Sequence, residues 1–192
     1  QSKRVFFLPD EHLGRNTGVQ VGIELDEMAI WDRNRQQLTG STDPRLILWN
    51  GYCPIHQQFT RDKVRQLRQE HSGVQTIVHP ECPHETIREA NASGSTEAII
   101  EHIQASSPGS AWAIGTEINL VKRLARQYPD RTIVSLDETV EPCPDMTRST
   151  PENLLWCLEG LLKGEIINQV SVEFEIANWA RLAIQRMLDL GC

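Results

Sequence analysis

Two cysteines of this sequence occupy the same local setting, in which an apolar run leads through a short loop into Cys-Pro. Cys53 lies in WNGYCPIH, with His56 three residues further on, and Cys143 lies in EPCPDM. The proline removes a backbone N–H and stiffens the loop that presents the sulfur. Such thiols are either small buried hydrophobes or metal ligands. Because the two are far apart in the chain, they do not form the paired cysteines of a zinc ribbon, whereas an iron–sulfur cluster tolerates this spacing.

A second candidate group is TIVHPECP, where a strand ends in His79, Pro80 and Glu81. Side chains at i and i+2 of an extended segment point the same way. His79 and Glu81 can therefore face one pocket as a base and an acid, or as clamps on a polar substrate. A surface loop with solvated charges is the alternative, and Cys82 in the same stretch is a rival metal ligand.

A third candidate is the stretch GSTE, in which Ser95 and Thr96 directly precede a helical pattern. The free N–H groups and hydroxyls of such a helix N-terminus can bind a phosphate or a carboxylate. The same residues cap an ordinary helix, and the local sequence by itself favours capping. Thr116 and Glu117 in IGTEINL have the same two interpretations.

The elements that must position these groups alternate between short apolar strands and amphipathic helices, which indicates an α/β fold with largely parallel sheets. Functional groups in such sheets gather at the carboxyl ends of the strands. The expected strands are 5–8, 46–49, 76–78, 111–114 and 132–135. The expected helices are 61–70, 96–104, 119–127, 151–163 and 173–190. We expect the last helix to dock and close the fold, and Cys157 to lie in the core.

A weak internal repeat relates the two halves of the chain. Residues 4–16 parallel 111–123, and residues 46–70 parallel 132–159. In the second pair each Cys-Pro is followed, seven residues after the cysteine, by a threonine that can cap the next helix. Cys53 and Cys143 therefore occupy equivalent places in two similar units, which suggests ligands shared across a pseudo-symmetric interface.

The composition excludes several classes of function. The 192 residues carry a net charge of -7, which argues against a nucleic-acid or acidic-membrane partner. No apolar run approaches the roughly 20 residues that span a bilayer. The five cysteines are Cys53, Cys82, Cys143, Cys157 and Cys192. This odd, widely spaced set is a poor disulfide framework and suits a reducing compartment.

The first residues carry an expectation about the chain itself. Gln1 is not an initiator methionine, and the apolar strand expected at 5–8 follows almost at once. A strand this apolar normally lies inside a sheet, covered on both faces. We therefore expect a chain that lacks N-terminal material.

Six motifs, taken in order, resemble the quinolinate synthase family. They are FLPDEHLGRN, W-N-G-x-C-x-x-H (49–56), V-H-P-E-C-P (78–83), G-S-T-E (94–97), I-G-T-E (114–117) and C-P-x-M (143–146). The ordered set covers nearly the whole chain and is highly specific. The resemblance implies a cytoplasmic transferase that condenses iminoaspartate (iminosuccinate) with dihydroxyacetone phosphate to give quinolinate for NAD biosynthesis. It also implies a partner that supplies iminoaspartate, an aspartate oxidase or dehydrogenase.

The resemblance implies a fold of three similar three-layer αβα units, with short parallel sheets, around a pseudo-threefold axis. Each unit of the family donates one cysteine to a single [4Fe–4S] cluster, whose open iron acts as a Lewis acid. Residues 1–72 would be the latter part of the second unit and 73–150 the third unit. Residues 151–192 would be a C-terminal helical segment that packs on the first unit.

The resemblance also implies roles for single residues. Cys53 and Cys143 would be cluster ligands, and the third cysteine ligand would be absent from this chain. Because two of three thiolates would hold the cluster poorly, we expect the 192-residue piece to be inactive alone and the full-length chain to be active. The chain departs from some members at Asp137 and Val140, where they carry extra cysteines, and at Thr147, where a lysine is common.

In the pocket, the resemblance makes Glu81 the residue that moves protons during imine chemistry and dehydration. His79 would bind the anionic substrate or the hydroxyl of an intermediate, and His56 would be a further catalytic histidine. Ser95 and Thr96 would hold a substrate carboxylate or phosphate. Two alternatives remain open: another [4Fe–4S] hydro-lyase or dehydratase, and a non-enzymatic α/β binding module whose cysteines are structural.

Overall fold

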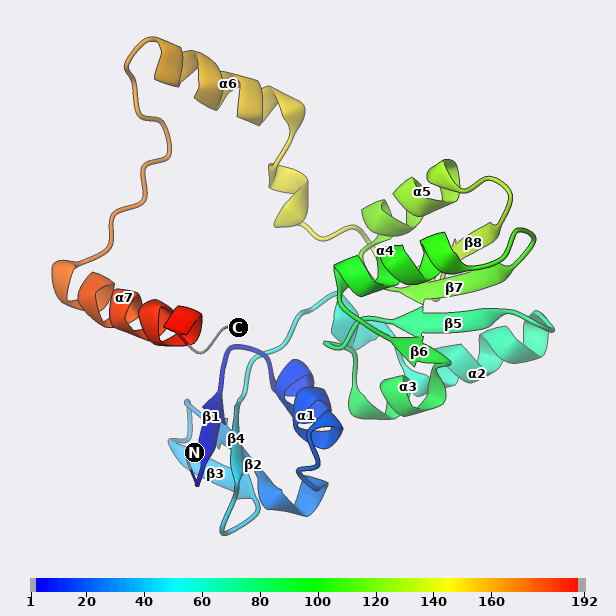
Figure 1. Cartoon of the computed structure of the whole chain (residues 1–192), viewed down its shortest axis with the longest axis horizontal. Helices are drawn as coiled ribbons and strands as arrows, with labels where there is room; N and C mark the ends of the chain where they lie inside the picture. Colours follow the sequence, from blue (N-terminus) through cyan, green and yellow to red (C-terminus); the bar gives the residue numbers. More distant parts are fainter. Residues whose placement is uncertain (1–2, 190–192) are drawn as a thin grey trace. The chain divides into compact units, whose positions relative to one another are not determined.

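The structure, a computed structural model, describes residues 3–189, and the chain divides into two units. The first unit ends at Cys143 and contains two β-sheets with their helices, and the second begins at Pro144 and is helical (Figure 1). The predicted α/β class with short parallel sheets is confirmed. The domain boundaries predicted near residues 72 and 150 stay predictions.

The first sheet has the strand order β1-β4-β2-β3. Its strands are β1 (Val5–Phe7), β2 (Met28–Asp32), β3 (Gln37–Gly40) and β4 (Leu46–Trp49). β4 runs parallel to both β1 and β2, whereas β3 is antiparallel to β2. The hairpin of β2 and β3 was not predicted, and Gln36 turns it with a positive φ of 52°.

β1 lies at the edge of the first sheet and, within residues 3–189, pairs only with β4. An apolar strand of this kind normally lies inside a sheet, which is why the sequence led us to expect missing N-terminal material. Val5 and Phe6 are accordingly 47% and 49% exposed. The apolar character of this strand thus does not reflect burial within the described part of the chain.

Helix α1 (Glu11–Gln20) covers this sheet although its sequence, EHLGRNTGVQ, is a poor helix former. Gly14 and Gly18, one turn apart, explain why it packs there. A Cβ on Gly14 would lie 2.6 Å from a carbon of Phe7, and one on Gly18 would lie 2.5 Å from a carbon of Leu46. The glycines therefore allow the helix backbone to approach the strands closely, a packing gain that overrides helix propensity.

The second sheet is fully parallel, with the strand order β6-β5-β7-β8. Its strands are β5 (Gln75–Val78), β6 (Ala92–Ser93), β7 (Ala111–Gly115) and β8 (Thr132–Ser135). Helices α2 (Arg61–Glu70) and α3 (His84–Glu89) cover one face, and α4 (Thr96–Ala105) and α5 (Ile118–Gln127) cover the other (Figure 1). The parallel sheet thus lies between two layers of helices, which are the crossover connections between its strands.

Each face of the second sheet has its own core. Ile77 and Ile114 pack with Ile99 of α4 and Leu124 of α5 on one side. On the other side, a second cluster gathers Phe59, Val64, Val78, Cys82 and Ala113. Because both faces are buried, the strands carry near-continuous apolar runs, which is why they were recognisable in the sequence.

The two predicted threonine caps are confirmed. Thr60 Oγ1 accepts a hydrogen bond from the Lys63 N–H at 3.4 Å, and Thr150 Oγ1 accepts one from the Asn153 N–H at 3.1 Å. Thr60 thus starts α2, and Thr150 starts α6 (Pro151–Leu162).

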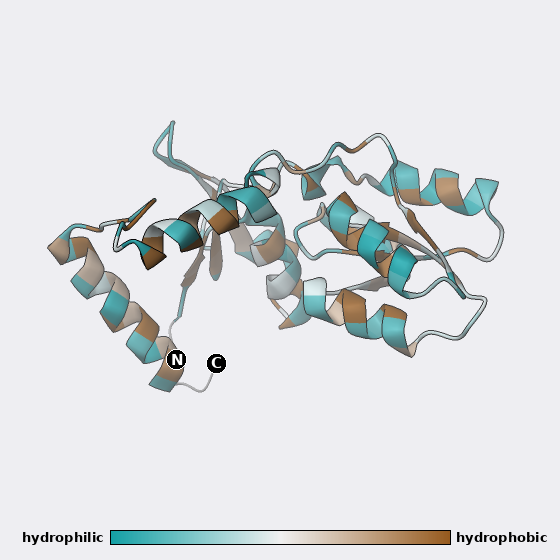
Figure 2. Cartoon of the chain, turned by 90° about the horizontal axis from the view of Figure 1, so that it is seen from above, coloured by the Kyte–Doolittle hydropathy of each residue, from teal (hydrophilic) through white to brown (hydrophobic). Residues whose placement is uncertain are grey.

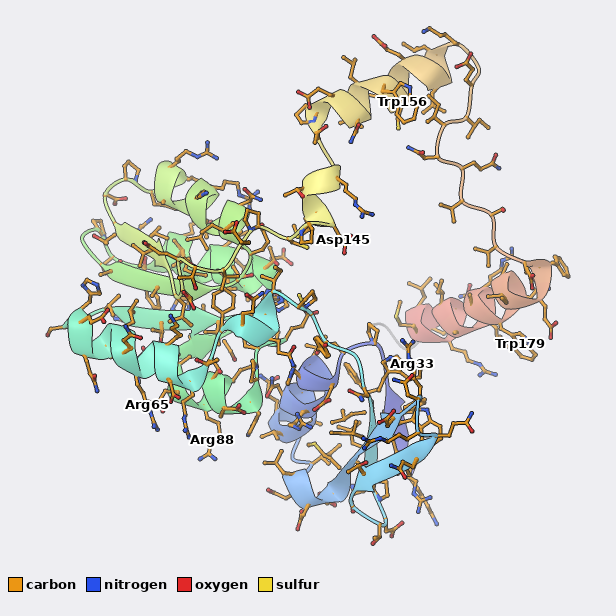
Figure 3. The ribbon with its side chains drawn as sticks, turned by 180° about the vertical axis from the view of Figure 1, so that it is seen from behind. Arg33, Arg65, Arg88, Asp145, Trp156 and Trp179 are labelled. Carbon is orange, nitrogen blue, oxygen red and sulfur yellow. The ribbon has the colours of Figure 1, made fainter. Side chains whose placement is uncertain are left out.

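The second unit holds a short 3-10 helix, η3 (Met146–Arg148), then α6 and α7 (Phe174–Asp189). Hydrophobic residues run along both α-helices (Figure 2), and Trp156 and Trp179 project from them with 53% and 66% of their surface exposed (Figure 3). The core position predicted for Cys157 is wrong, because it is only partly buried and its sulfur accepts from Asn168 Nδ2 at 3.6 Å. Docking of the last helix stays a prediction, and Gln1 and Cys192 lie outside the described residues.

Within residues 3–189, no helix combines the length and the apolar character required to cross a bilayer.

Candidate metal centre and catalytic site

Four predicted site residues meet at the carboxyl ends of two strands from different sheets. Cys53 and His56 follow β4 of the first sheet, and His79 and Glu81 follow β5 of the second. One potential ligand atom from each of Cys53, His56 and Glu81 lies within 4.8 Å of the others. His56 and Glu81, which are 25 positions apart in the sequence, therefore belong to one compact polar group, as expected for carboxyl strand ends.

His56 is the centre of this group and is only 8% exposed. Its Nδ1 lies 2.8 Å from Glu81 Oε2, and its Nε2 lies 3.0 Å from Thr116 Oγ1. Its ring also stacks on His79, with centroids 4.1 Å apart. Because both ring nitrogens are engaged within the protein, the His56 ring is held in one orientation between Glu81 and Thr116.

The electrostatics of the group separate its two histidines. Burial alone would lower the pKa of His56, but its interactions with Cys53 and Glu81 outweigh burial and raise this pKa to about 9. For His79, burial and the neighbouring charge of His56 lower the pKa to about 4. The hydrogen bond from His56 lowers the pKa of Glu81 despite its partial burial. The stacked pair thus combines a cationic His56 with a neutral His79 at neutral pH.

Cys53 and Cys82 differ in how readily they can bind a metal. Burial opposes ionisation of Cys53, but the adjacent His56 lowers the pKa of this thiol overall, which favours the thiolate that metals require. Cys82 is fully buried in the core, its Sγ lies 3.7 Å from the Gly115 carbonyl oxygen, and burial raises its pKa strongly. This environment makes Cys82 a core residue and weakens it as a rival ligand.

The loop that carries Glu81 is held by a residue that the sequence did not single out. Asn16 of α1 donates through Nδ2 to the carbonyl oxygens of Pro80 at 2.8 Å and Cys82 at 2.9 Å. Its own Oδ1 lies 2.8 Å from His84 Nδ1. Asn16 is 3% exposed and thus ties the first sheet's helix to the backbone on both sides of Glu81.

Cys143 follows β8, and its surroundings match those of Cys53. Both residues pack against the same core cluster, which contains Val78 and Ala113. The Cys53 N–H donates to Asp10 Oδ2 at 2.9 Å, and the Cys143 N–H donates to Glu117 Oε1 at 3.4 Å. Both thiols are free and half-buried, so this chain offers two soft sulfur donors on one core, a set that suits an iron–sulfur group.

Ser95 and Thr96 lie apart from this group. Ser95 caps α4, since its Oγ accepts from the Ala98 N–H at 3.3 Å, and both hydroxyl residues are exposed. They follow β6, whose neighbour β5 leads into His79. Within residues 3–189, the structure records no hydrogen bond from either residue to His79 or Glu81. The capping interpretation is therefore confirmed for Ser95, and ligand binding by the pair stays a prediction.

Thr116 and Glu117 turn out to belong to the site. The sequence placed them after a strand but left capping and binding open. Glu117 caps α5 and reaches the Cys143 amide, while Thr116 binds His56. The only available signal was their place at a carboxyl strand end, which does not show which neighbour they meet.

Comparisons with known proteins agree with these motifs. The quinolinate synthetase A protein family (NadA) matches residues 1–189. Two proteins named quinolinate synthase, from Geobacillus kaustophilus and Listeria monocytogenes, are 46% and 45% identical to this chain over 194 aligned residues. Each alignment covers 100% of this chain and 53% of the relative. One from Bacillus cereus is 46% identical, covering 98% of this chain and 52% of its own length. The chain thus spans about half the length of the curated relatives it matches, and it belongs to the quinolinate synthetase A family.

Proposed function

We propose that this chain is the part of a quinolinate synthase that carries two cluster ligands and the acid–base group. The enzyme would be a transferase that condenses iminoaspartate with dihydroxyacetone phosphate to quinolinate. The observation that carries the proposal is the group of His56, His79 and Glu81 beside Cys53. Family membership supports the same activity. The reaction would serve NAD biosynthesis in the cytoplasm, with iminoaspartate supplied by an aspartate oxidase or dehydrogenase.

Cys53 and Cys143 would hold a [4Fe–4S] cluster together with a thiolate that lies outside this chain. The free, half-buried state of both thiols and the lowered pKa of Cys53 support this assignment. When bound, the cluster supplies an open iron that acts as a Lewis acid on a substrate oxygen or nitrogen. The 192-residue chain alone would be inactive, because two thiolates hold such a group poorly.

Glu81 would move protons at its Oε2. This oxygen lies 2.8 Å from His56 Nδ1, so the histidine can stabilise the carboxylate and lower its pKa. A carboxylate in this state can take a proton from the carbon beside an imine. It can return that proton to a hydroxyl that leaves as water in the dehydration. His56 Nε2, bonded to Thr116 Oγ1, fixes the ring that supports both steps.

His79 would orient the substrate. Its Nδ1 accepts a hydrogen bond from the Glu81 N–H at 3.3 Å. In the neutral ring that its lowered pKa favours, the proton therefore sits on Nε2. The Nε2–H can donate to a substrate carboxylate or to the hydroxyl of an intermediate, next to the carboxylate that moves the protons.

Ser95 and Thr96 would bind the charged end of a substrate. They stand at the start of α4, a helix of 10 residues, and both are exposed. The helix N-terminus attracts anions through its free N–H groups. The phosphate of dihydroxyacetone phosphate and the carboxylates of iminoaspartate are the matching groups.

The test is an assay of the protein produced from its complete gene and reconstituted with iron and sulfide without oxygen. Iminoaspartate and dihydroxyacetone phosphate are supplied together, and quinolinate is measured by chromatography against a standard. We expect quinolinate to form only when both substrates are present. A protein that carries its cluster but forms no quinolinate would contradict the proposal and favour another cluster-dependent dehydratase.

A further inference from the structure

The two cysteine loops share a hydrogen bond that was not predicted from their sequences. In each, the backbone N–H of the cysteine donates to a carboxylate that also caps a helix. Asp10 accepts from the Leu13 N–H through Oδ1 at 2.7 Å and from the Cys53 N–H through Oδ2 at 2.9 Å. One carboxylate therefore joins the start of α1 to the loop after β4.

Glu117 repeats the arrangement at the other cysteine. Its Oε2 accepts from the Asn119 N–H at 2.8 Å, and its Oε1 accepts from the Cys143 N–H at 3.4 Å and from Asn119 Nδ2 at 3.0 Å. Aligning residues 4–16 with 111–123 places Asp10 opposite Glu117. The same two-oxygen device thus occurs twice, at equivalent positions of the internal repeat.

Helix capping alone does not explain these acids. Asp10 and Glu117 are 5% and 6% exposed, and burying a carboxylate is costly unless it is well bonded. Thr60 and Ser95 cap α2 and α4 with a single hydroxyl oxygen. Asparagine caps a helix about as well as aspartate. What the carboxylate adds is a second acceptor: in Asp10 it accepts from the Cys53 N–H, and in Glu117 it accepts from both the Cys143 N–H and Asn119 Nδ2.

We propose that Asp10 and Glu117 are positioning residues that fix the backbone of Cys53 and Cys143 so that both sulfurs point at one cluster. This proposal rests on the proposed function, in which these cysteines are the ligands. Each carboxylate connects the cysteine loop to the first turn of a helix that packs on its sheet. The loop therefore keeps its shape before the cluster binds, which reduces the entropy lost on loading.

The test replaces one acceptor and keeps the cap. Asp10→Asn and Glu117→Gln each retain one oxygen for the helix and turn the other position into a donor that cannot accept from the cysteine amide. Asp62→Asn and Glu85→Gln are matched controls, because both residues are exposed in first helical turns. Asp10→Ser is a further variant that keeps a capping hydroxyl should Asp10→Asn fold poorly.

The first measurement is amide hydrogen exchange in the full gene product without its cluster. Hydrogen bonds to charged groups are among the stronger ones. We therefore expect Asp10→Asn to speed exchange at Cys53 about tenfold or more, with no change at Cys143. Glu117→Gln should do the reverse with a smaller factor, because its bond is longer. Unchanged exchange at the cysteine amides would overturn the proposal.

The second measurement is the decay of the cluster absorption near ~400 nm under a chelator, in reconstituted protein. We expect several-fold faster decay in Asp10→Asn and Glu117→Gln than in the controls, and partial recovery in Asp10→Glu. Faster amide exchange with an unchanged cluster lifetime would overturn the positioning role. If the unsubstituted protein takes up no cluster, the proposed function fails, while amide exchange still reports the two bonds.

Discussion

The loops of Cys53 and Cys143 are two versions of one design. Each follows a parallel strand, passes through Cys-Pro into a 3-10 helix and ends at a threonine cap seven residues after the cysteine. The 3-10 helices are η2 (His56–Gln58) and η3. The two loops differ in the side chains between the cysteine and the threonine. The first loop has Ile55, His56 and Phe59, where the second has Asp145, Met146 and Ser149.

This difference decides what each loop can do. Ile55 and Phe59 are 5% and 0% exposed and anchor the first loop in the core, whereas Met146 is 59% exposed and Asp145 projects from its segment (Figure 3). The anchored turn holds His56 against Glu81. A cysteine can act as a ligand from the loop alone. An acid–base role for His56 also requires Ile55 and Phe59, because these buried side chains hold the turn that carries the histidine. Under the proposed function, the first repeat would supply both a cluster ligand and the acid–base group, and the second repeat a ligand alone.

The largest expected effect tests what the two loops have in common. Cys53→Ser and Cys143→Ser, made in the full gene product, should each remove nearly all cluster absorption near ~400 nm and nearly all quinolinate formation. Cys157→Ser, at a partly exposed cysteine outside the loops, is the matched control and should keep both. Equal absorption in all three variants would mean that the cysteines are structural and would favour the binding-module alternative.

The second-largest expected effect tests whether only the first loop takes part in acid–base chemistry. Glu81→Gln and His56→Gln should lower kcat by roughly 10²–10⁴-fold, the usual contribution of a positioned acid or base, while the cluster absorption stays. Met146→Gln, at the equivalent position of the second loop, should change kcat by less than about threefold, since surface substitutions are mostly mild. A loss for Met146→Gln as large as that for His56→Gln would show that the two loops share the chemistry.

A reciprocal exchange tests the anchors. Phe59→Ser empties a fully buried position and should cost about 3–5 kcal/mol of unfolding free energy, the range for large-to-small core substitutions of aromatic residues. Ser149→Phe, at an exposed position, should change it by less than about 0.5 kcal/mol. Denaturant unfolding followed by circular dichroism measures both. A small loss for Phe59→Ser would mean that the first loop is not held by this side chain.

Much of the second sheet was predictable because strands that are buried on both faces require apolar residues at successive positions. The strand at 132–135 and the helix at 61–70 were predicted with their observed ends, and in the first sheet so was the strand at 46–49. The first sheet was harder. Helix α1 contains Gly14 and Gly18, whose value lies in contacts with strands that the local pattern does not reveal.

The candidate site was also predictable only in part. Cys53, His56, His79 and Glu81 were singled out because their types and strand-end positions are visible in the sequence. Long-range contacts were not visible: Asn16 meets Pro80 across 64 residues, and Thr116 meets His56 across 60. Asp10 was not singled out, because its bond to the Cys53 N–H spans 43 residues. Such partners are set by topology, which single-residue propensities do not encode.

The smallest expected effect sharpens the contrast between His56 and its stacked neighbour. In the cluster-free protein, NMR titration of the imidazole signals should give a pKa of about 9 for His56 and about 4 for His79. The raised value means that His56 stabilises the fold fully below its unfolded pKa of about 6.5, and that this contribution is lost as the pH rises through about 9. For His79 the contribution is present above about 6.5 and is lost as the pH falls through about 4.

The Glu81→Gln variant provides the control for this titration. It removes one of the interactions that raise the pKa of His56 while burial, which lowers that pKa, remains. The pKa of His56 should therefore fall in this variant. Two histidines that titrate together near about 6.5 in the unsubstituted protein would contradict the stacked, hydrogen-bonded arrangement. The first loop would then lack the interactions with Glu81 and His79 that distinguish His56 from Met146 of the second loop.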